Sequence, residues 1–76
     1  MEQQSRPLDA LNKSRNKRVI VELKNNKQLI GNLTAFDIHI NVVLTDAEER
    51  QDGEVKRKLG LVFIRGDTII LISPAE

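Results

Sequence analysis

Short stretches in which apolar and polar residues alternate follow one another along most of this chain, and they predict a series of β-strands. In the stretch from Arg18 to Lys24, for example, Val19, Val21 and Leu23 fall on one face of an extended chain. We expect five strands, at residues Arg18–Lys24, Gln28–Phe36, Val42–Arg50, Val55–Ile64 and Thr68–Ser73.

Turn residues and internal glycines indicate how these strands are connected. The pairs Asn25–Asn26 and Asp52–Gly53 tolerate positive φ and predict tight hairpins. Gly31 and Gly60 fall inside strands, where a glycine is typical of a sharp bend or a close backbone approach. Because a small barrel needs strong bends, five such antiparallel strands predict a mainly β fold with a small open barrel.

The segment before the first strand predicts a short helix at Arg6–Ser14. Pro7 suits the first helical turn, Leu8 and Leu11 share one face, and Ser5 could cap the free N–H groups. Such a short helix is not stable alone in water, so we expect it to pack against the sheet.

The last two strands contain the apolar runs Leu61–Ile64 and Ile69–Ile72, which do not alternate with polar residues. An open barrel of this size cannot bury both faces of both strands, and exposed apolar edges promote aggregation unless a partner covers them. We therefore expect edge-to-edge pairing with other copies of the chain, which closes into a ring when the rotation allows.

Length and composition narrow the class of protein. The 76 residues predict a single domain over residues 1–76, with residues 1–5 flexible, and the apolar share of 39% is typical of a globular chain. No apolar run is long enough for a transmembrane helix, and no secretory signal is visible. The absence of cysteine excludes disulfides and thiolate metal sites and fits a cytoplasmic protein. The net charge of +1 does not by itself indicate nucleic-acid binding.

The first cluster of candidate binding residues is the segment Phe36–Asn41. It places His39, the only histidine of the chain, between Asp37 and Asn41. A lone histidine is more often structural than functional, but these three polar side chains alternate with isoleucines. We therefore expect the three side chains to point the same way. A buried core would not place an aspartate, a histidine and an asparagine on one face.

The second cluster is the segment Ile64–Asp67. Gly66 permits a turn that other residues resist. Taken singly, Arg65 could be an ordinary surface residue and Asp67 an ordinary turn residue. Together with the first cluster they can hold a flat base, because His39 and Arg65 can stack on its two faces.

Asn41 is suited to read the edge of that base, since its amide matches uracil N3–H and a neighbouring carbonyl. A freely flipping amide would match cytosine equally well. Asp67 only accepts hydrogen bonds, so we expect it to hold the Asn41 amino group and thereby to select uracil over cytosine.

The same residues give little support to an enzyme or a metal site. One histidine with scattered carboxylates provides no nucleophile, triad or metal cage, so we expect no catalytic residue, metal or cofactor. The acidic stretch Asp46–Arg50 is expected to be a solvated strand end. A structural module that self-assembles or docks a protein partner at its strand edges remains the alternative to a nucleic-acid-binding protein.

The order of these features resembles the Sm and Sm-like (LSm) family, particularly its archaeal members. The resemblance rests on the helix, Gly31, the Phe36–Asn41 stretch, the Asp46–Glu49 stretch and the Ile64–Asp67 turn, and it covers almost the whole chain. It implies a five-stranded bent sheet with an N-terminal helix. It also implies a ring of seven copies in which the fourth strand of one copy pairs with the fifth strand of the next, although the sequence itself does not distinguish six copies from seven.

In that family the matching histidine, asparagine and arginine line a central pore and bind uridines of single-stranded RNA. The resemblance therefore implies a U-rich RNA-binding protein that acts as a ring-shaped scaffold or chaperone in RNA metabolism. The implied RNA-binding residues are His39, Asn41, Arg65, Gly66, Asp67 and Asp37. A second RNA surface near the helix would involve Arg6 and Phe36, where Phe36 keeps the stacking face of the tyrosine found in many relatives and lacks its hydroxyl.

Overall fold

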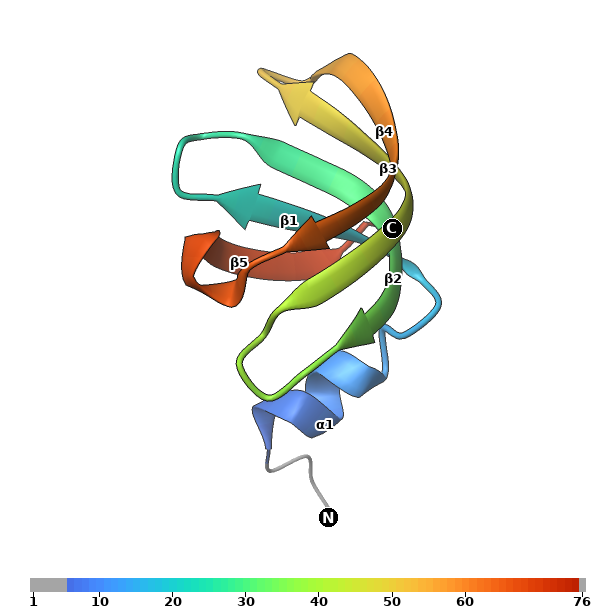
Figure 1. Cartoon of the computed structure of the whole chain (residues 1–76), viewed down its shortest axis with the longest axis vertical. Helices are drawn as coiled ribbons and strands as arrows, with labels where there is room; N and C mark the ends of the chain where they lie inside the picture. Colours follow the sequence, from blue (N-terminus) through green and yellow to red (C-terminus); the bar gives the residue numbers. More distant parts are fainter. Residues whose placement is uncertain (1–5, 76) are drawn as a thin grey trace.

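One short helix followed by five strands makes up the computed structural model, which describes residues 6–75 (Figure 1). The expected flexibility of residues 1–5 and the expected capping by Ser5 lie outside the described residues. The elements are α1 (Pro7–Asn12), β1 (Arg18–Leu23), β2 (Gln28–Phe36), β3 (Val42–Gln51), β4 (Glu54–Ile64) and β5 (Ile69–Pro74), with the 3-10 turn η1 (Gly66–Thr68) before β5.

The strands begin and end within one residue of their predicted bounds, whereas the helix is shorter than predicted. Pro7 occupies the first turn of α1 as expected. Regular helix ends at Asn12, and the chain then turns until Asn16 adopts a φ of 66°. The backbone N–H of Asn16 donates to the carbonyl of Leu33 at 2.6 Å, which ties the end of this turn to β2.

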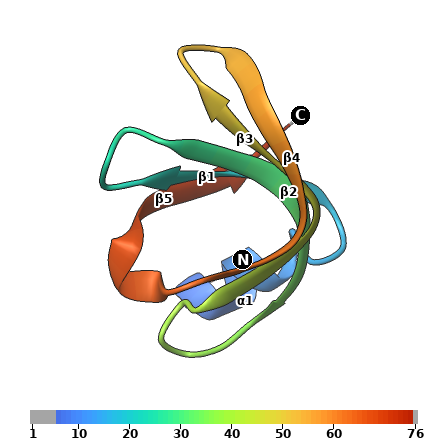
Figure 2. The same cartoon turned by 45° about the horizontal axis from the view of Figure 1, so that its top comes forward.

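The five strands form one antiparallel sheet in the order β4-β3-β2-β1-β5. The sheet curls strongly, and α1 lies at one end of the molecule (Figures 1 and 2). Within residues 6–75, β4 and β5 are the two edges and do not pair with each other. The predicted mainly β fold, a helix with a bent five-stranded antiparallel sheet, is therefore confirmed.

The sharp bend runs across the sheet where two glycines were predicted to bend it. A Cβ atom at Gly31 would lie 3.1 Å from Cα and Cβ of Ala47, so β2 and β3 approach closely at that point. Gly60 of β4 lies opposite Ala47 with a φ of 76°, and Asp46 of β3 has a φ of 52°. The register between β3 and β4 shifts here, as at a β-bulge, which re-aims the strands.

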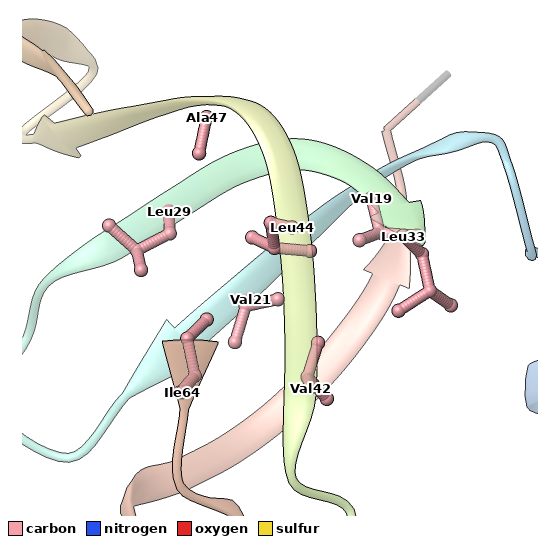
Figure 3. Close-up of a cluster of buried hydrophobic side chains, with 8 residues drawn as sticks. All are labelled: Val19, Val21, Leu29, Leu33, Val42, Leu44, Ala47 and Ile64. Carbon is pink, nitrogen blue, oxygen red and sulfur yellow. The ribbon is translucent and has the colours of Figure 1, made fainter. Parts of the chain in front are cut away.

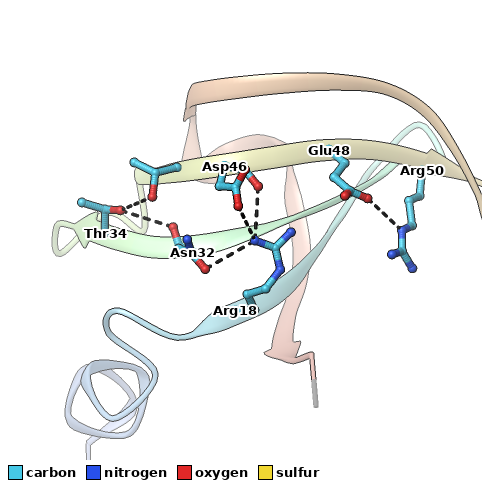
Figure 4. A network of polar contacts seen from close by, with 7 residues as sticks. Arg18, Asn32, Thr34, Asp46, Glu48 and Arg50 are labelled. Carbon is cyan, nitrogen blue, oxygen red and sulfur yellow. Dashed lines mark hydrogen bonds and ion pairs between the residues drawn. The ribbon is translucent and has the colours of Figure 1, made fainter.

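Polar side chains on three strands hold this bulge (Figure 4). Arg18 of β1 donates from Nη1 to the carbonyl of Asp46 at 3.2 Å and lies 3.5 Å from its carboxylate. The same nitrogen donates to Oδ1 of Asn32 on β2 at 3.4 Å. The backbone of the bulge thus has side-chain partners where the regular strand ladder is interrupted.

The core lies inside the curl of the sheet and uses the faces that the alternation predicted (Figure 3). Val19, Val21, Leu33 and Leu44 have no exposed surface. Full burial of such a side chain contributes about 1.5–3 kcal/mol. The buried cluster comprises Val19, Val21, Leu29, Leu33, Val42, Leu44, Ala47 and Ile64.

The acidic stretch after Asp46 is not the solvated strand end that we expected. Ala47 is 2% exposed and Glu49 is 7% exposed, because β3 turns both toward the interior after the bulge. Glu49 accepts a hydrogen bond from Nε of Arg57 on β4 at 2.8 Å and lies 3.6 Å from Nζ of Lys27. The bond from Arg57, followed by the charges of both cations, lowers the pKa of Glu49 against the opposing effect of desolvation.

Both edge strands expose large apolar side chains. Leu61 and Phe63 of β4 are 59% and 74% exposed, and Ile70 and Leu71 of β5 are 57% and 45% exposed. Such surfaces at unpaired strands are suited to pairing with another chain. The single helix of residues 6–75 lacks the length and apolar character to cross a membrane.

Candidate functional site

The segment between β2 and β3 is a compact turn. The backbone N–H of Ile40 donates to the carbonyl of Asp37 at 3.0 Å, and the N–H of Asp37 donates to the carbonyl of Asn41 at 3.1 Å. Ile40 has a φ of 61°, which is a rare conformation for a β-branched residue. The three polar side chains of this segment are nevertheless brought together, although by a turn and not by the alternation of an extended chain.

The carboxylate of Asp37 organises this turn. Its Oδ1 accepts from the backbone N–H of His39 at 2.8 Å and of Asn41 at 3.1 Å. Its Oδ2 accepts from the side-chain amino group of Asn41 at 3.1 Å. The side-chain bond from Asn41, together with the two backbone N–H bonds, lowers the pKa of Asp37, so the turn is held by an ionised carboxylate at neutral pH.

The other end of the Asn41 amide is held by the second cluster. The backbone N–H of Gly66 donates to Oδ1 of Asn41 at 2.9 Å. This approach requires glycine, because a Cβ atom at Gly66 would overlap the carbonyl oxygen of His39 and lie 2.9 Å from the carbonyl carbon of Ile40. The amide of Asn41 therefore has one orientation, with its donor on Asp37 and its acceptor on Gly66.

Asp67 has a different partner from the one we expected. Its Oδ2 accepts from Nη2 of Arg65 at 3.1 Å, and both side chains are mostly exposed. The expectation that Asp67 holds the Asn41 amino group is wrong, because Asp37 occupies that position. The chain after Arg65 is fixed by Thr68, whose hydroxyl donates to the Arg65 carbonyl at 2.7 Å.

The two clusters meet, as the sequence predicted, although they are about twenty-five residues apart in the chain. One pocket is lined by His39, Asn41, Arg65, Gly66 and Asp67. Asp37 supports this pocket through its bonds to the turn. The pocket offers a ring, a guanidinium and an oriented amide, which are the groups that bind a nucleobase by stacking and edge hydrogen bonds.

A second, mostly apolar pocket adjoins the first. Phe36, Val43 and Phe63 line it, and it also borders Asn41 and Arg65. The pocket therefore extends the candidate site from the polar turns onto the adjoining ends of β2, β3 and β4.

The cation that lies over the Phe36 ring is Arg15, whose guanidinium carbon is 5.8 Å from the ring centroid. Arg6, the residue that we expected beside Phe36, is exposed and precedes α1. Arg15 carried no sequence signal of its own, because only the tie between the loop after α1 and β2 places it there. Within residues 6–75 no group of three or more acidic or histidine side chains is arranged to hold a metal ion.

Comparison with known proteins identifies the family of the chain. The LSM domain family matches residues 9–74. A putative snRNP Sm-like protein of Archaeoglobus fulgidus is 57% identical over 70 residues, which cover 92% of this chain and 91% of that protein. A protein of the same description from Thermococcus kodakarensis is 52% identical over 71 residues, covering 93% of each chain.

Solved structures of similar proteins have the same fold. A Pyrococcus abyssi Sm protein in complex with a uridine heptamer superimposes with a TM-score of 0.89 at 49% identity, covering 93% of this chain and all of that one. A heptameric archaeal Sm protein superimposes with a TM-score of 0.84 at 40% identity, covering 90% of this chain and 98% of that one.

Proposed function

The chain belongs to the LSM domain family, and from this premise we propose that it binds uridine-rich single-stranded RNA as a ring of identical copies. A relative of 49% identity has been solved with a uridine heptamer, and another relative is heptameric. The single observation that carries the proposal is the amide of Asn41, held at both ends beside His39 and Arg65.

The fixed amide accounts for a preference for uracil. Asn41 has one N–H and one acceptor lone pair left after its bonds to Asp37 and Gly66. These match the carbonyl and the N3–H of uracil. Cytosine entering in the same orientation would set acceptor against acceptor and donor against donor, which leaves polar groups unpaired.

Stacking supplies affinity to the same site. His39 and Arg65 line the pocket and can cover the two faces of one base, which contributes about 1–3 kcal/mol per base. The contact between Asp67 and Arg65 restricts where the guanidinium plane lies. We propose that Asp67 positions Arg65 for stacking, while Asp37 positions Asn41 for reading the base edge.

Ring formation would join the exposed edges and multiply the sites. Pairing β4 of one copy with β5 of the next would cover Leu61, Phe63 and Ile70 and leave no free edge. Identical pockets around a ring would then bind successive bases of one strand, each at a high effective concentration after the first contact. We propose seven copies, as in the heptameric relative.

We also propose a cellular role for this RNA binding. The ring would act in the cytoplasm as a scaffold or chaperone for RNA and would not itself be an enzyme. Intact labelled RNA after incubation with the pure protein would support the absence of catalysis, and cell fractionation would test the location.

The second RNA surface also remains a proposal. Phe36 offers a half-buried aromatic ring beside the apolar pocket. The guanidinium of Arg15 over that ring supports a basic environment there, and we retain Arg6 as a residue that could reach a bound strand.

The test of the main proposal is to change the base-reading groups and leave the ring intact. Asn41→Ala and Arg65→Ala should each weaken binding of labelled oligo-U, with Asn25→Ala, an exposed amide in the turn between β1 and β2, as the matched control. The mass of each variant verifies the ring. Unchanged oligo-U affinity in both site variants would favour the structural module, to which the exposed apolar edges would equally be suited.

A further inference from the structure

The net charge of +1 hides a strong segregation of charge along the chain. Residues 6–18 contain five basic side chains and one acidic side chain, Asp9. The rest of the chain has seven basic and ten acidic residues, from totals of 12 and 11. The segment that contains α1 and the loop after it is therefore the basic part of an otherwise acidic molecule.

The structure gathers most of this charge in the loop that connects α1 to β1. α1 lies at one end of the long axis, the loop after it runs back along the side of the sheet, and the hairpin of β3 and β4 forms the other end (Figures 1 and 2). Lys13, Arg15 and Lys17 are exposed in the loop, and within residues 6–75 none of them forms an ion pair with a carboxylate. Arg18 differs, because it is engaged with Asp46 at the bulge.

The loop that carries these three side chains is anchored. The N–H of Lys17 donates to the carbonyl of Ser14 at 3.0 Å, and the N–H of Leu33 donates to the carbonyl of Lys17 at 2.9 Å. With the bond from Asn16 to Leu33, the loop is fastened to β2 at both Asn16 and Lys17. The charges are therefore presented at defined positions, which lowers the ordering cost of binding an anion.

The basic segment of residues 6–18 is continuous with the candidate base site. Arg15 lies over the ring of Phe36 at 5.8 Å from its centroid. Phe36 in turn lines the apolar pocket that borders Asn41 and Arg65. A strand whose bases occupy the site can thus continue past Phe36 toward the loop, where cations that pair with no carboxylate of residues 6–75 would meet its phosphates.

Resting on the proposed function, we propose that Lys13, Arg15 and Lys17 form a phosphate-binding track for the single-stranded RNA that flanks the bound uridines. The track recognises charge and not base identity, since phosphate contacts carry no sequence information. It explains how a chain with almost no net charge can hold RNA beyond the bases that it reads. In a ring the track would recur once per copy around the helix-bearing face.

The test compares two pairs of lysines with equal change in charge. The variant Lys13→Gln/Lys17→Gln removes track charges and leaves Arg15 on Phe36, while Lys24→Gln/Lys56→Gln removes exposed charges outside the track. The probes are a short oligo-U and the same tract extended by adenosines at either end. Ring mass is verified for each variant.

The wild-type protein should bind the extended RNA more tightly than the short one and with a steeper dependence on salt. Each lost phosphate contact lowers the slope of log affinity against log salt by about 0.7 for a single strand. The track variant should lose both the gain from the extension and that part of the slope, whereas the control variant should keep them.

A track variant that matches the wild-type protein in gain and slope would overturn the proposal. An equal loss in the control variant would also overturn it, because positive charge outside the track would then contribute as much to RNA binding as charge within it. The U-over-C preference of the short probes reports on the proposed function separately. Its absence in the wild-type protein would remove the base site, whereas its presence with an unchanged slope would remove only the track.

Discussion

Asp37 and Asp67 lie in two turns that meet at one pocket, but their carboxylates contact different partners. Asp37 accepts from the Asn41 amide, and Asp67 accepts from Arg65. The sequence places one aspartate in each turn, but it does not indicate which of the two contacts Asn41. That choice depends on how the turn after β2 folds, and the left-handed backbone of Ile40 brings Asn41 back onto Asp37.

This division predicts different effects for the same chemical change at two positions. Asp37→Asn should lower the ratio of oligo-U to oligo-C affinity, because the variant amide cannot hold the amino group of Asn41 as a carboxylate does. A lost hydrogen bond of about 0.5–1.5 kcal/mol corresponds to a change of about 2- to 10-fold. Asp67→Asn should weaken both oligonucleotides and keep the ratio. Fluorescence titrations measure all four affinities, and loss of the preference in Asp67→Asn alone would contradict our assignment.

Gly66 is the second residue on which the site depends. In Gly66→Ala the new methyl group would overlap the His39 carbonyl, so the two turns must separate. Overpacking of this kind costs about 1–3 kcal/mol of the free energy of unfolding, and oligo-U affinity should fall with it. Chemical denaturation and titration with oligo-U measure the two effects. Wild-type affinity in the folded variant would show that the contact between the turns is not needed.

At the level of the elements, the bulge at Asp46 changes which face of β3 points toward the core. Before the bulge Val42 and Leu44 face the core, and after it Ala47 and Glu49 do. The bulge inserts one extra residue into β3. Without it, regular alternation would have turned the side chain of Glu48 toward the core. The sequence therefore predicted the bounds of this strand and not its facing beyond residue 46, because a bulge has no fixed sequence signature.

Glu49 makes the stability of the sheet depend on pH. Its pKa in the folded protein lies below the ordinary value of 4.5, so the unfolded chain binds the proton more readily. The stabilisation is complete above that value and is lost as the pH falls through the lower folded pKa. Denaturation between neutral and acid pH should show stability falling in this range, and less steeply in Glu49→Gln.

The matched control for this effect is Glu54→Gln. Glu54 is exposed, and its contact with Lys56 is long, at 3.9 Å. The control should keep the wild-type pH dependence. An identical acid profile in Glu49→Gln would mean that the carboxylate between Arg57 and Lys27 contributes nothing to this dependence.

At the scale of the whole molecule, the unpaired edges follow directly from the sequence, because the apolar runs in β4 and β5 cannot both be buried in one open barrel. The meeting of the two polar turns could also be anticipated, both from their complementary chemistry and from the resemblance of the whole chain to one family. What the sequence could not provide was the place of Arg15, since a tertiary contact between the loop after α1 and β2 decides it.

The edges predict that ring formation depends on β5. Ile70→Glu places a charge on an exposed edge position and should yield smaller species that bind oligo-U much more weakly. Ile38→Glu is the matched control for the mass alone, because Ile38 is 74% exposed and belongs to neither edge strand, so the mass of this variant should not change. Light scattering measures the mass. Wild-type oligo-U affinity in a verified monomer of Ile70→Glu would contradict the link between ring and binding.

The central claim is that an oriented amide reads uracil in a stacking site. The most direct measurement is the affinity of the wild-type protein for oligo-U and oligo-C of equal length, at low and at moderate salt. Base reading predicts a preference for oligo-U that persists when salt is added, because the phosphates of the two probes are the same. Equal affinities that fall together with salt would show attraction to the backbone alone and would contradict the claim.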